Sequence, residues 1–237
     1  MSARSATFEV PPGPVLVIAP HPDDETLGCG GLIAQCVRNA HPVHTVFVTD
    51  GGASHPGSRA WSRQRLARQR EAEAEEALQR LGAGDEPRSF LRLADADMPR
   101  RATPAYAHAV GSIAGILDAL EPRFVVLPWR RDPHCDHRGS WSLGMEAVSA
   151  CNRSPDVLEY SIWLDELGEP GDHPEAGEME RLSVAVSSDI KRYALFAHRS
   201  QLGELVFDDP TGFVLGPETI TRLTGPEEVY WRQCNAR

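Results

Sequence analysis

Apolar runs alternate with amphipathic stretches along this chain in a regular order. Residues 15–19, VLVIA, are continuously apolar, which is typical of a strand that is buried on both faces. Comparable runs predict further strands at residues 43–49, 89–93, 124–128, 157–163 and 181–186. Helical spacing of apolar residues, together with capping signals, predicts helices over residues 26–39, 60–81, 103–120 and 139–152.

The alternation of strands and helices predicts an α/β fold. We expect three layers, with a mostly parallel, Rossmann-like sheet and helices on both faces. A length of 237 residues favours a single domain, residues 1–237. Ligands of such sheets bind beyond the carboxyl ends of the strands, where the strand order reverses. Two clusters rich in His and Asp, at residues 21–25 and 134–137, follow predicted strands, so the fold can bring them together.

Charge and hydropathy narrow the class of partner. The net charge of −10 argues against general affinity for nucleic acid or an anionic membrane, because both need a basic face. No apolar stretch has the ~20 residues that a membrane span requires, and the first residues do not resemble a signal peptide. We therefore expect a cytoplasmic protein without membrane insertion that acts on a small molecule, alone or as a homo-oligomer.

The five cysteines are an odd number without zinc-finger spacing, which favours reduced thiols. Four of them are expected to pack as small buried apolar side chains: Cys29, Cys36, Cys151 and Cys234.

Both polar clusters contain metal ligands at a spacing of three. His21 and Asp24 stand three positions apart, and His134 and His137 repeat that spacing. Imidazole and carboxylate groups are zinc ligands, and a catalytic zinc takes three protein ligands and a water. A single HxxD is also a common helix start, so the case depends on the pair of clusters. The glycines of GCGG could instead cradle a phosphate, but the neighbouring aspartates would repel an anion.

The sequences HPDDE and PHCDH, each after a predicted strand, resemble those of the LmbE-like (PIG-L) family of zinc-dependent N-acetylglucosaminyl deacetylases. A looser likeness extends from Val15 to about Gln201 and includes RxxE in the long helix, LxD after the third strand, and AHRSQ. The resemblance implies a metal-dependent hydrolase that removes an acetyl or other acyl group from the amide nitrogen of an N-acetylglucosamine-type sugar or conjugate.

The resemblance also implies roles for particular residues. His21, Asp24 and His137 would hold the metal, Zn²⁺ or alternatively Fe²⁺. Asp23 would be the general base toward a metal-activated water. His134 would stabilise charge on the carbonyl oxygen or protonate the leaving amine.

Several neighbours of these residues have either one or two expected roles. Asp136 either orients a histidine or pairs with one of three arginines, Arg130, Arg131 or Arg138. Arg70 and Asp95 match sugar-hydroxyl contacts of the family, or form a helix-face ion pair and a turn. Glu25 is expected to cap the helix that follows it, and Cys135 to serve in packing. Specificity is expected from the loops at residues 51–58, 94–103 and 165–178.

Other functions remain open from the sequence. The chain could be a non-catalytic domain that binds a sugar or nucleotide, although all five candidate residues are present. It could be a metal-free glycosidase that pairs Asp23 or Asp24 with Asp136, but such an enzyme needs no histidines at these spacings. It could apply the same chemistry to a non-sugar acylated amine.

Overall fold

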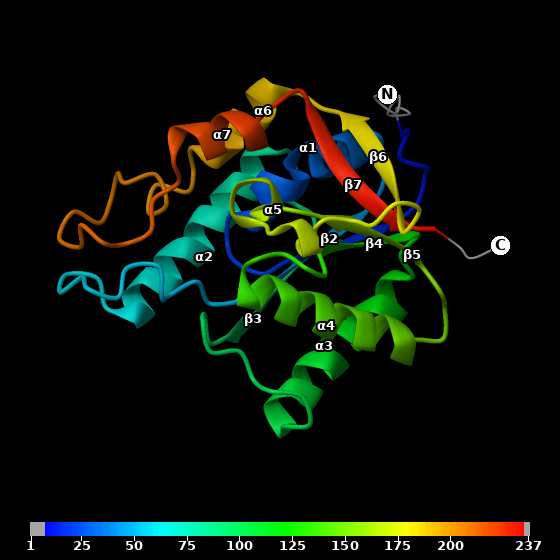
Figure 1. Cartoon of the computed structure of the whole chain (residues 1–237), viewed down its shortest axis with the longest axis horizontal. Helices are drawn as coiled ribbons and strands as arrows, with labels where there is room; N and C mark the ends of the chain where they lie inside the picture. Colours follow the sequence, from blue (N-terminus) through cyan, green and yellow to red (C-terminus); the bar gives the residue numbers. More distant parts are fainter. Residues whose placement is uncertain (1–7, 235–237) are drawn as a thin grey trace.

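The computed structural model describes residues 8–234, which form a seven-stranded sheet with helices on both faces (Figure 1). The strands are β1 (Val15–Ala19), β2 (Val43–Thr49), β3 (Arg88–Leu93), β4 (Phe124–Pro128), β5 (Asp156–Tyr160), β6 (Met179–Ala185) and β7 (Glu227–Gln233). The helices are α1 (Asp24–Arg38), α2 (Arg63–Arg80), α3 (Pro104–Leu120), α4 (Cys135–Ala150), α5 (Leu164–Leu167), the 3₁₀ turn η1 (Pro170–Asp172), α6 (Ser188–Leu195) and α7 (Pro217–Leu223).

The strand order is β3-β2-β1-β4-β5-β7-β6. The first five strands pair in parallel, whereas β7 runs antiparallel to both β5 and β6. The expected mostly parallel α/β sheet is therefore confirmed. Its order reverses between β1 and β4, so the segments that leave these two strands meet at the carboxyl edge, where this architecture places its ligands.

Successive residues of β1 enter two separate cores. Val15 and Val17 pack with residues of α1, α2 and α6 on one face of the sheet. Leu16 and Ile18 pack with residues of α3 and α4 on the other face. Every side chain of the strand is at most 1% exposed, which confirms a strand covered on both sides. Figure 1 shows α3 and α4 in green on one side of the sheet and α1 and α6 on the other.

Two helices begin earlier than the sequence predicts. α1 begins at Asp24 and α4 at Cys135, whereas the sequence placed their starts near residues 26 and 139. His134 caps α4, and its Nδ1 accepts from the backbone N–H of Asp136 at 3.2 Å. Histidine is not among the usual N-cap residues, which explains the error. Both polar clusters therefore lie at helix N-termini.

The C-terminal third differs most from expectation. The predicted strand 157–163 ends at Tyr160 and is followed by the short helix α5. β7 was not predicted, because the acidic side chain of Glu228 occupies a buried position and breaks the apolar alternation. Within residues 8–234, no helix combines the length and apolar character needed to span a membrane.

The prediction that four cysteines are buried is correct for two of them. Cys29 and Cys36 are buried, but Cys151 is half-buried and Cys234 is exposed. Cys151 ends α4 and Cys234 directly follows β7, so both lie where an element leaves the packed layers.

The glycines of α1 allow other elements to approach its backbone. A Cβ on Gly28 would overlap the ring of Tyr160, and one on Gly31 would overlap Val186. Glu228 accepts from the backbone N–H of Gly31 at 2.7 Å and pairs with Lys191 at 2.7 Å. Lys191, the only lysine of the chain, also donates to the carbonyl of Leu27 at 2.9 Å. The glycines thus serve helix packing and a buried ion pair, not phosphate binding.

We expect Lys191→Met to lower the free energy of unfolding by about 3–5 kcal/mol, because it leaves the buried Glu228 carboxylate without its cation. The measurement is urea unfolding. Adding Glu228→Gln to this variant should recover much of the loss. Arg232→Met, at an exposed ion pair with Glu180, is the matched control and should cost less than about 1 kcal/mol. Equal losses in the two single variants would contradict this view of the pair.

Candidate active site

One cavity of 690 Å³ opens at the carboxyl edge of the sheet, beside the ends of β1 and β4. The structure brings together there six of the residues singled out in the sequence, namely His21, Asp23, Asp24, Arg70, Asp95 and His134. His137 and Asp136 are buried directly behind this lining. Two segments that are more than 100 positions apart therefore form one site, as the fold predicts.

Asp24 lies between two histidines. Its Oδ2 is 3.1 Å from Nδ1 of His21 and 3.3 Å from Nε2 of His137. Ring nitrogens of His21, His134 and His137 also lie within 4.8 Å of one another. Two imidazoles and a carboxylate that converge in this way form a donor set suited to a divalent transition metal.

The ring nitrogens of His137 and the carboxylates that face them favour a cation at this position. The side chain is fully buried, yet neither ring nitrogen makes a hydrogen bond within the described residues. Nε2 faces Asp24 and Nδ1 lies 3.4 Å from Oδ1 of Asp132, both outside hydrogen-bonding geometry. Burial lowers the pKa of His137, but these two carboxylates outweigh it and raise that pKa to about 9. The surroundings therefore favour positive charge, which a metal ion supplies when the imidazole is neutral.

Asp23 pairs with an arginine, whereas Asp24 contacts two histidines. Arg70 contacts Oδ1 of Asp23 at 3.0 Å and also donates to the carbonyl of Pro22 at 2.9 Å. Burial raises the pKa of the Asp23 carboxyl to about 6, although Arg70 opposes the shift. A carboxylate with a pKa in this range suits a general base near neutral pH. Arg70 thus pairs with Asp23, and the alternative of an ion pair on the face of α2 is wrong.

A second buried pair supports the backbone of Asp23. This residue has φ 153°, a conformation that L-residues rarely adopt. Its N–H donates to Oε2 of Glu25 at 2.9 Å, and Oε1 of Glu25 lies 3.1 Å from Nε2 of His198. Glu25 and His198 are both fully buried. The expectation that Glu25 caps the amides of the helix is therefore corrected. Its carboxylate accepts instead from the N–H of Asp23, the residue before the helix, because the unusual backbone conformation there directs this N–H toward it.

We expect His198→Ala to lower kcat by about 10- to 100-fold with little change in KM, because Glu25 would no longer hold the backbone of Asp23 in place. Steady-state kinetics of metal-loaded protein test this. His108→Ala, at an exposed histidine of α3, is the control and should retain the wild-type kcat. A folded His198→Ala variant with unchanged kcat, or with a change only in KM, would contradict the role.

The carboxylates around His21 decide between the two interactions expected for Asp136, with a histidine or with an arginine. Asp136 Oδ2 lies 3.3 Å from Nε2 of His21 and accepts from the N–H of Ala96 at 2.8 Å. Asp95 Oδ1 lies 3.3 Å from the same nitrogen. These carboxylates, with Asp24, raise the pKa of His21 above its usual value despite burial. The three candidate arginines contact other groups, so within the described residues Asp136 faces the histidine and forms no ion pair with any of them.

His134 faces the cavity from the start of α4, with its ring centroid 4.8 Å from that of His21. Burial, together with the neighbouring His21 and His137, lowers the pKa of His134. Cys135 does not line the cavity and is exposed, so the packing role expected for it is wrong. Its Sγ lies 3.5 Å from Oδ1 of Asp136 and within 4.8 Å of a ring nitrogen of His134.

Sequence reasoning missed several groups. Asp132, fully buried, lies behind His137 and accepts from the N–H of His134 at 2.9 Å. An acidic residue two positions before a candidate histidine was the available signal. Gln201 was part of the AHRSQ resemblance but was given no role; it lines the cavity from a distant segment, and its Oε1 has no hydrogen-bond partner among the described residues. The expected specificity loops contribute Ala53, Ser54, Asp95, Ala96 and Leu167, but the segment 211–214 was not foreseen.

The sequence model of the family described as "PIG-L: GlcNAc-PI de-N-acetylase" matches residues 16–148, which include both polar clusters. The chain belongs to the PIG-L family. The match covers the strands β1 and β4 and the starts of α1 and α4 that follow them, so the family's sequence pattern and the geometry coincide at the cavity.

Relatives of this PIG-L chain carry related names. It is 28% identical over 241 residues to the 1D-myo-inositol 2-acetamido-2-deoxy-alpha-D-glucopyranoside deacetylase of Rhodococcus jostii (strain RHA1), covering 79% of this chain and 81% of the relative. It is 31% identical over 142 residues to the diacetylchitobiose deacetylase of Thermococcus kodakarensis, covering 57% and 49%. The solved N,N'-diacetylchitobiose deacetylase from Pyrococcus horikoshii superposes with a TM-score of 0.59 at 26% identity, covering 79% and 70%.

Proposed function

We propose that this chain is a metal-dependent N-deacetylase. It would remove an acetyl or other acyl group from the amide nitrogen of an N-acetylglucosamine-type sugar or conjugate. The observation that carries this proposal is Asp24 between His21 and His137, with Asp23 held beside them by Arg70 in one cavity. The names of the three relatives given above, each a deacetylase of an acetylated amino sugar, support the same reaction.

His21, Asp24 and His137 would hold the metal, Zn²⁺ or Fe²⁺. When bound, such an ion lowers the pKa of water and polarises a carbonyl. Asp23 would accept the proton of the attacking water. We assign that proton to Oδ2, because Oδ1 is engaged by Arg70. A pKa of about 6 leaves Asp23 largely deprotonated at pH 7 and still basic enough to act.

His134 would act on the substrate from the start of α4, beside His21. It would donate to the carbonyl oxygen of the amide, or protonate the amine as the C–N bond breaks and acetate leaves. Because Nδ1 of His134 accepts from the backbone of Asp136, the proton would be carried at Nε2. Arg70, Asp95 and Gln201 line the cavity and offer hydrogen bonds to sugar hydroxyls.

Two alternatives from the sequence are less well supported by these contacts. A glycosidase needs one carboxylate free to protonate the glycosidic oxygen. Asp24 and Asp136 instead contact imidazoles, and Asp23 contacts a guanidinium. A non-catalytic binding domain would not need a strained residue with a raised carboxyl pKa beside a metal-type donor set. The same chemistry on a non-sugar acylated amine, a cytoplasmic location and a homo-oligomer stay predictions.

The test is to incubate metal-loaded protein with N-acetylglucosamine and its glycosides and to measure acetate, primary amine and reducing sugar. Acetate and amine should form in equal amounts, with no new reducing sugar from the glycosides. Release of reducing sugar without acetate would instead indicate a glycosidase, and no product from any substrate would refute the proposed function.

A further inference from the structure

The cavity has two chemically different walls. The candidate metal ligands and the hydrogen-bonding groups described above form one wall. A second part of the lining is apolar and comes from the start and end of α5 and the segment before α7: Trp163, Leu167, Phe213 and Val214. The hydroxyl groups on the edges of a single N-acetylated sugar ring match the polar wall, and they find no hydrogen-bond partners on Leu167, Phe213 or Val214. The apolar wall requires a separate explanation.

Three of these side chains are exposed to a degree that costs free energy in water. Leu167 is 63% exposed, Val214 is 47% exposed and Phe213 is 37% exposed. Exposed apolar residues are common singly, but a contiguous group on a cavity wall marks a binding surface. The cavity volume of 690 Å³ lies within the range of about 300–1,000 Å³ that holds drug-sized ligands. There is room for a group beyond the sugar.

The apolar wall is also held in place by hydrogen bonds. The N–H of Phe213 donates to the carbonyl of Ser54 at 2.7 Å, and its ring meets Trp163 edge to face at 5.7 Å between centroids. The N–H of Trp163 donates to Oδ2 of Asp132 at 3.2 Å, which ties this wall to the residue behind His137. The wall is therefore preformed and attached to the reacting end of the cavity.

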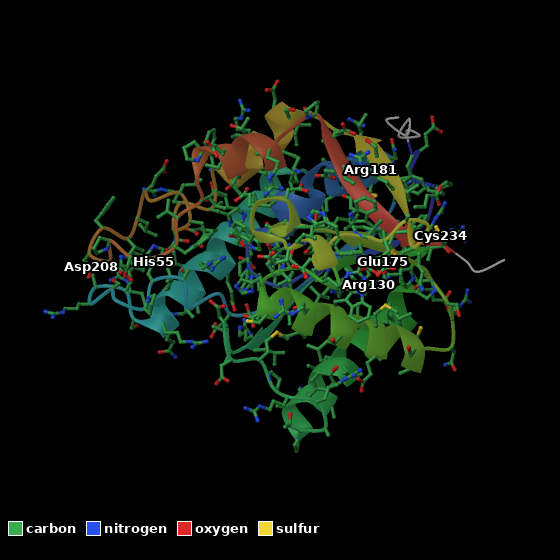
Figure 2. The ribbon with its side chains drawn as sticks, viewed as in Figure 1. His55, Arg130, Glu175, Arg181, Asp208 and Cys234 are labelled. Atoms are coloured by element: carbon green, nitrogen blue, oxygen red, sulfur yellow. The ribbon has the colours of Figure 1, made fainter. Side chains whose placement is uncertain are left out.

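Two neighbouring carboxylates join the loop that carries Phe213 to the loop at residues 51–62. Asp208 accepts from the N–H of Arg59 at 2.8 Å, and Asp209 accepts from the N–H of Gly57 at 2.8 Å. Figure 2 shows His55 and Asp208 together at this end of the molecule, far from Cys234. Because both loops are joined in this way, the wall keeps its shape without a ligand, and less conformational entropy is lost on binding.

We infer that the apolar wall is a subsite for an alkyl or aryl group attached to the N-acylated sugar, so that the substrate class is an apolar conjugate of an amino sugar. This inference rests on the proposed function. A second sugar ring is disfavoured as occupant, because Leu167, Phe213 and Val214 offer no side-chain hydrogen bonds. The apolar group belongs either to the aglycone or to a long N-acyl chain, and both sources have the same chemistry.

The test compares kcat/KM for substrates that differ in one group. An aryl glycoside of N-acetylglucosamine is set against the methyl glycoside, and an N-octanoyl sugar against the N-acetyl sugar. At least one apolar substrate should exceed its partner by about tenfold or more. The series that shows the gain identifies the source. Equal values in both series, or a preference for diacetylchitobiose over all apolar substrates, would overturn the inference.

Variants locate the effect. In Phe213→Ala the apolar-to-polar ratio of kcat/KM should fall at least about threefold, and Val214→Thr, of nearly the same shape, should also lower it. Phe207→Ala is the matched control, because Phe207 is 80% exposed but does not line the cavity. It should keep the wild-type ratio. An unchanged ratio in Phe213→Ala and Val214→Thr would overturn the inference.

A binding measurement separates this inference from the proposed function. Calorimetric titration of metal-loaded protein with glucosamine, its phenyl glycoside and N-octylglucosamine needs no turnover, because none of these ligands contains an amide to hydrolyse. Tighter binding of an apolar ligand, weakened in Phe213→Ala, would support the subsite even if no substrate were hydrolysed. If acetate is released but none of the apolar groups improves binding or kcat/KM, the subsite is wrong and the deacetylase stands.

Discussion

Asp23→Asn should lower kcat by about 10²- to 10⁴-fold while the protein keeps its metal, because the amide is similar in shape but cannot accept the proton of the attacking water. The proposed ligand set does not include Asp23, and Arg70 engages one of its oxygens. The substitution removes the charge that pairs with Arg70 but leaves His21, Asp24 and His137 unchanged. KM should change much less than kcat.

The measurement combines kinetics with metal analysis of the same preparation. Asp97→Asn, which changes an exposed aspartate outside the cavity lining, is the matched control and should behave as wild type. Wild-type kcat in Asp23→Asn would exclude Asp23 as the base. Loss of metal from Asp23→Asn, but not from the control, would instead place Asp23 among the ligands.

His137→Ala should lose both bound metal and activity. Its Nε2 faces Asp24, and the side chain is fully buried without hydrogen bonds among the described residues, so the ring is positioned to bind an ion. Two remaining ligands hold a divalent ion weakly, and we expect metal to fall from about one per chain to a small fraction after dialysis. Deacetylation should fall at least about 10³-fold, the scale expected when the activating ion is lost.

A cavity at a buried position also affects folding, so the variant is judged beside a second one. His137→Gln keeps more of the side-chain volume and should lose metal to a similar extent. His173→Ala, at an exposed histidine outside the cavity lining, should retain metal and activity. A folded His137→Ala protein that binds metal as wild type does would contradict the assigned ligand set.

The parallel half of the fold could be predicted from the sequence because its strands are buried on both faces and are therefore continuously apolar. β1 is the clearest case, since every side chain is at most 1% exposed. β7 could not be predicted, because Glu228 is buried through its pairing with Lys191 and looks like a surface residue in the sequence. Such burial depends on a partner from another element and leaves no local pattern.

The candidate site also contains residues that could be predicted from the sequence and residues that could not. The residues of the two motifs were found because each motif is short and follows a strand, and the strand order then brings them together. Asp132 lies close to His134 in sequence, so its acidic character was an available signal. His198 and Gln201 belong to the segment that follows α6, and nothing in their local sequence indicates which cavity they approach. Resemblance to the family was the one hint for that segment.

The central claim is that a metal ion held by His21, Asp24 and His137 is required for hydrolysis of an N-acetyl group. The most direct measurement is acetate release from N-acetylglucosamine glycosides by protein that has been stripped with a chelator and then titrated with Zn²⁺ or Fe²⁺. We expect no activity in the stripped protein and full recovery at about one ion per chain. Full activity in metal-free protein, or acetate release that does not depend on added metal, would contradict the claim.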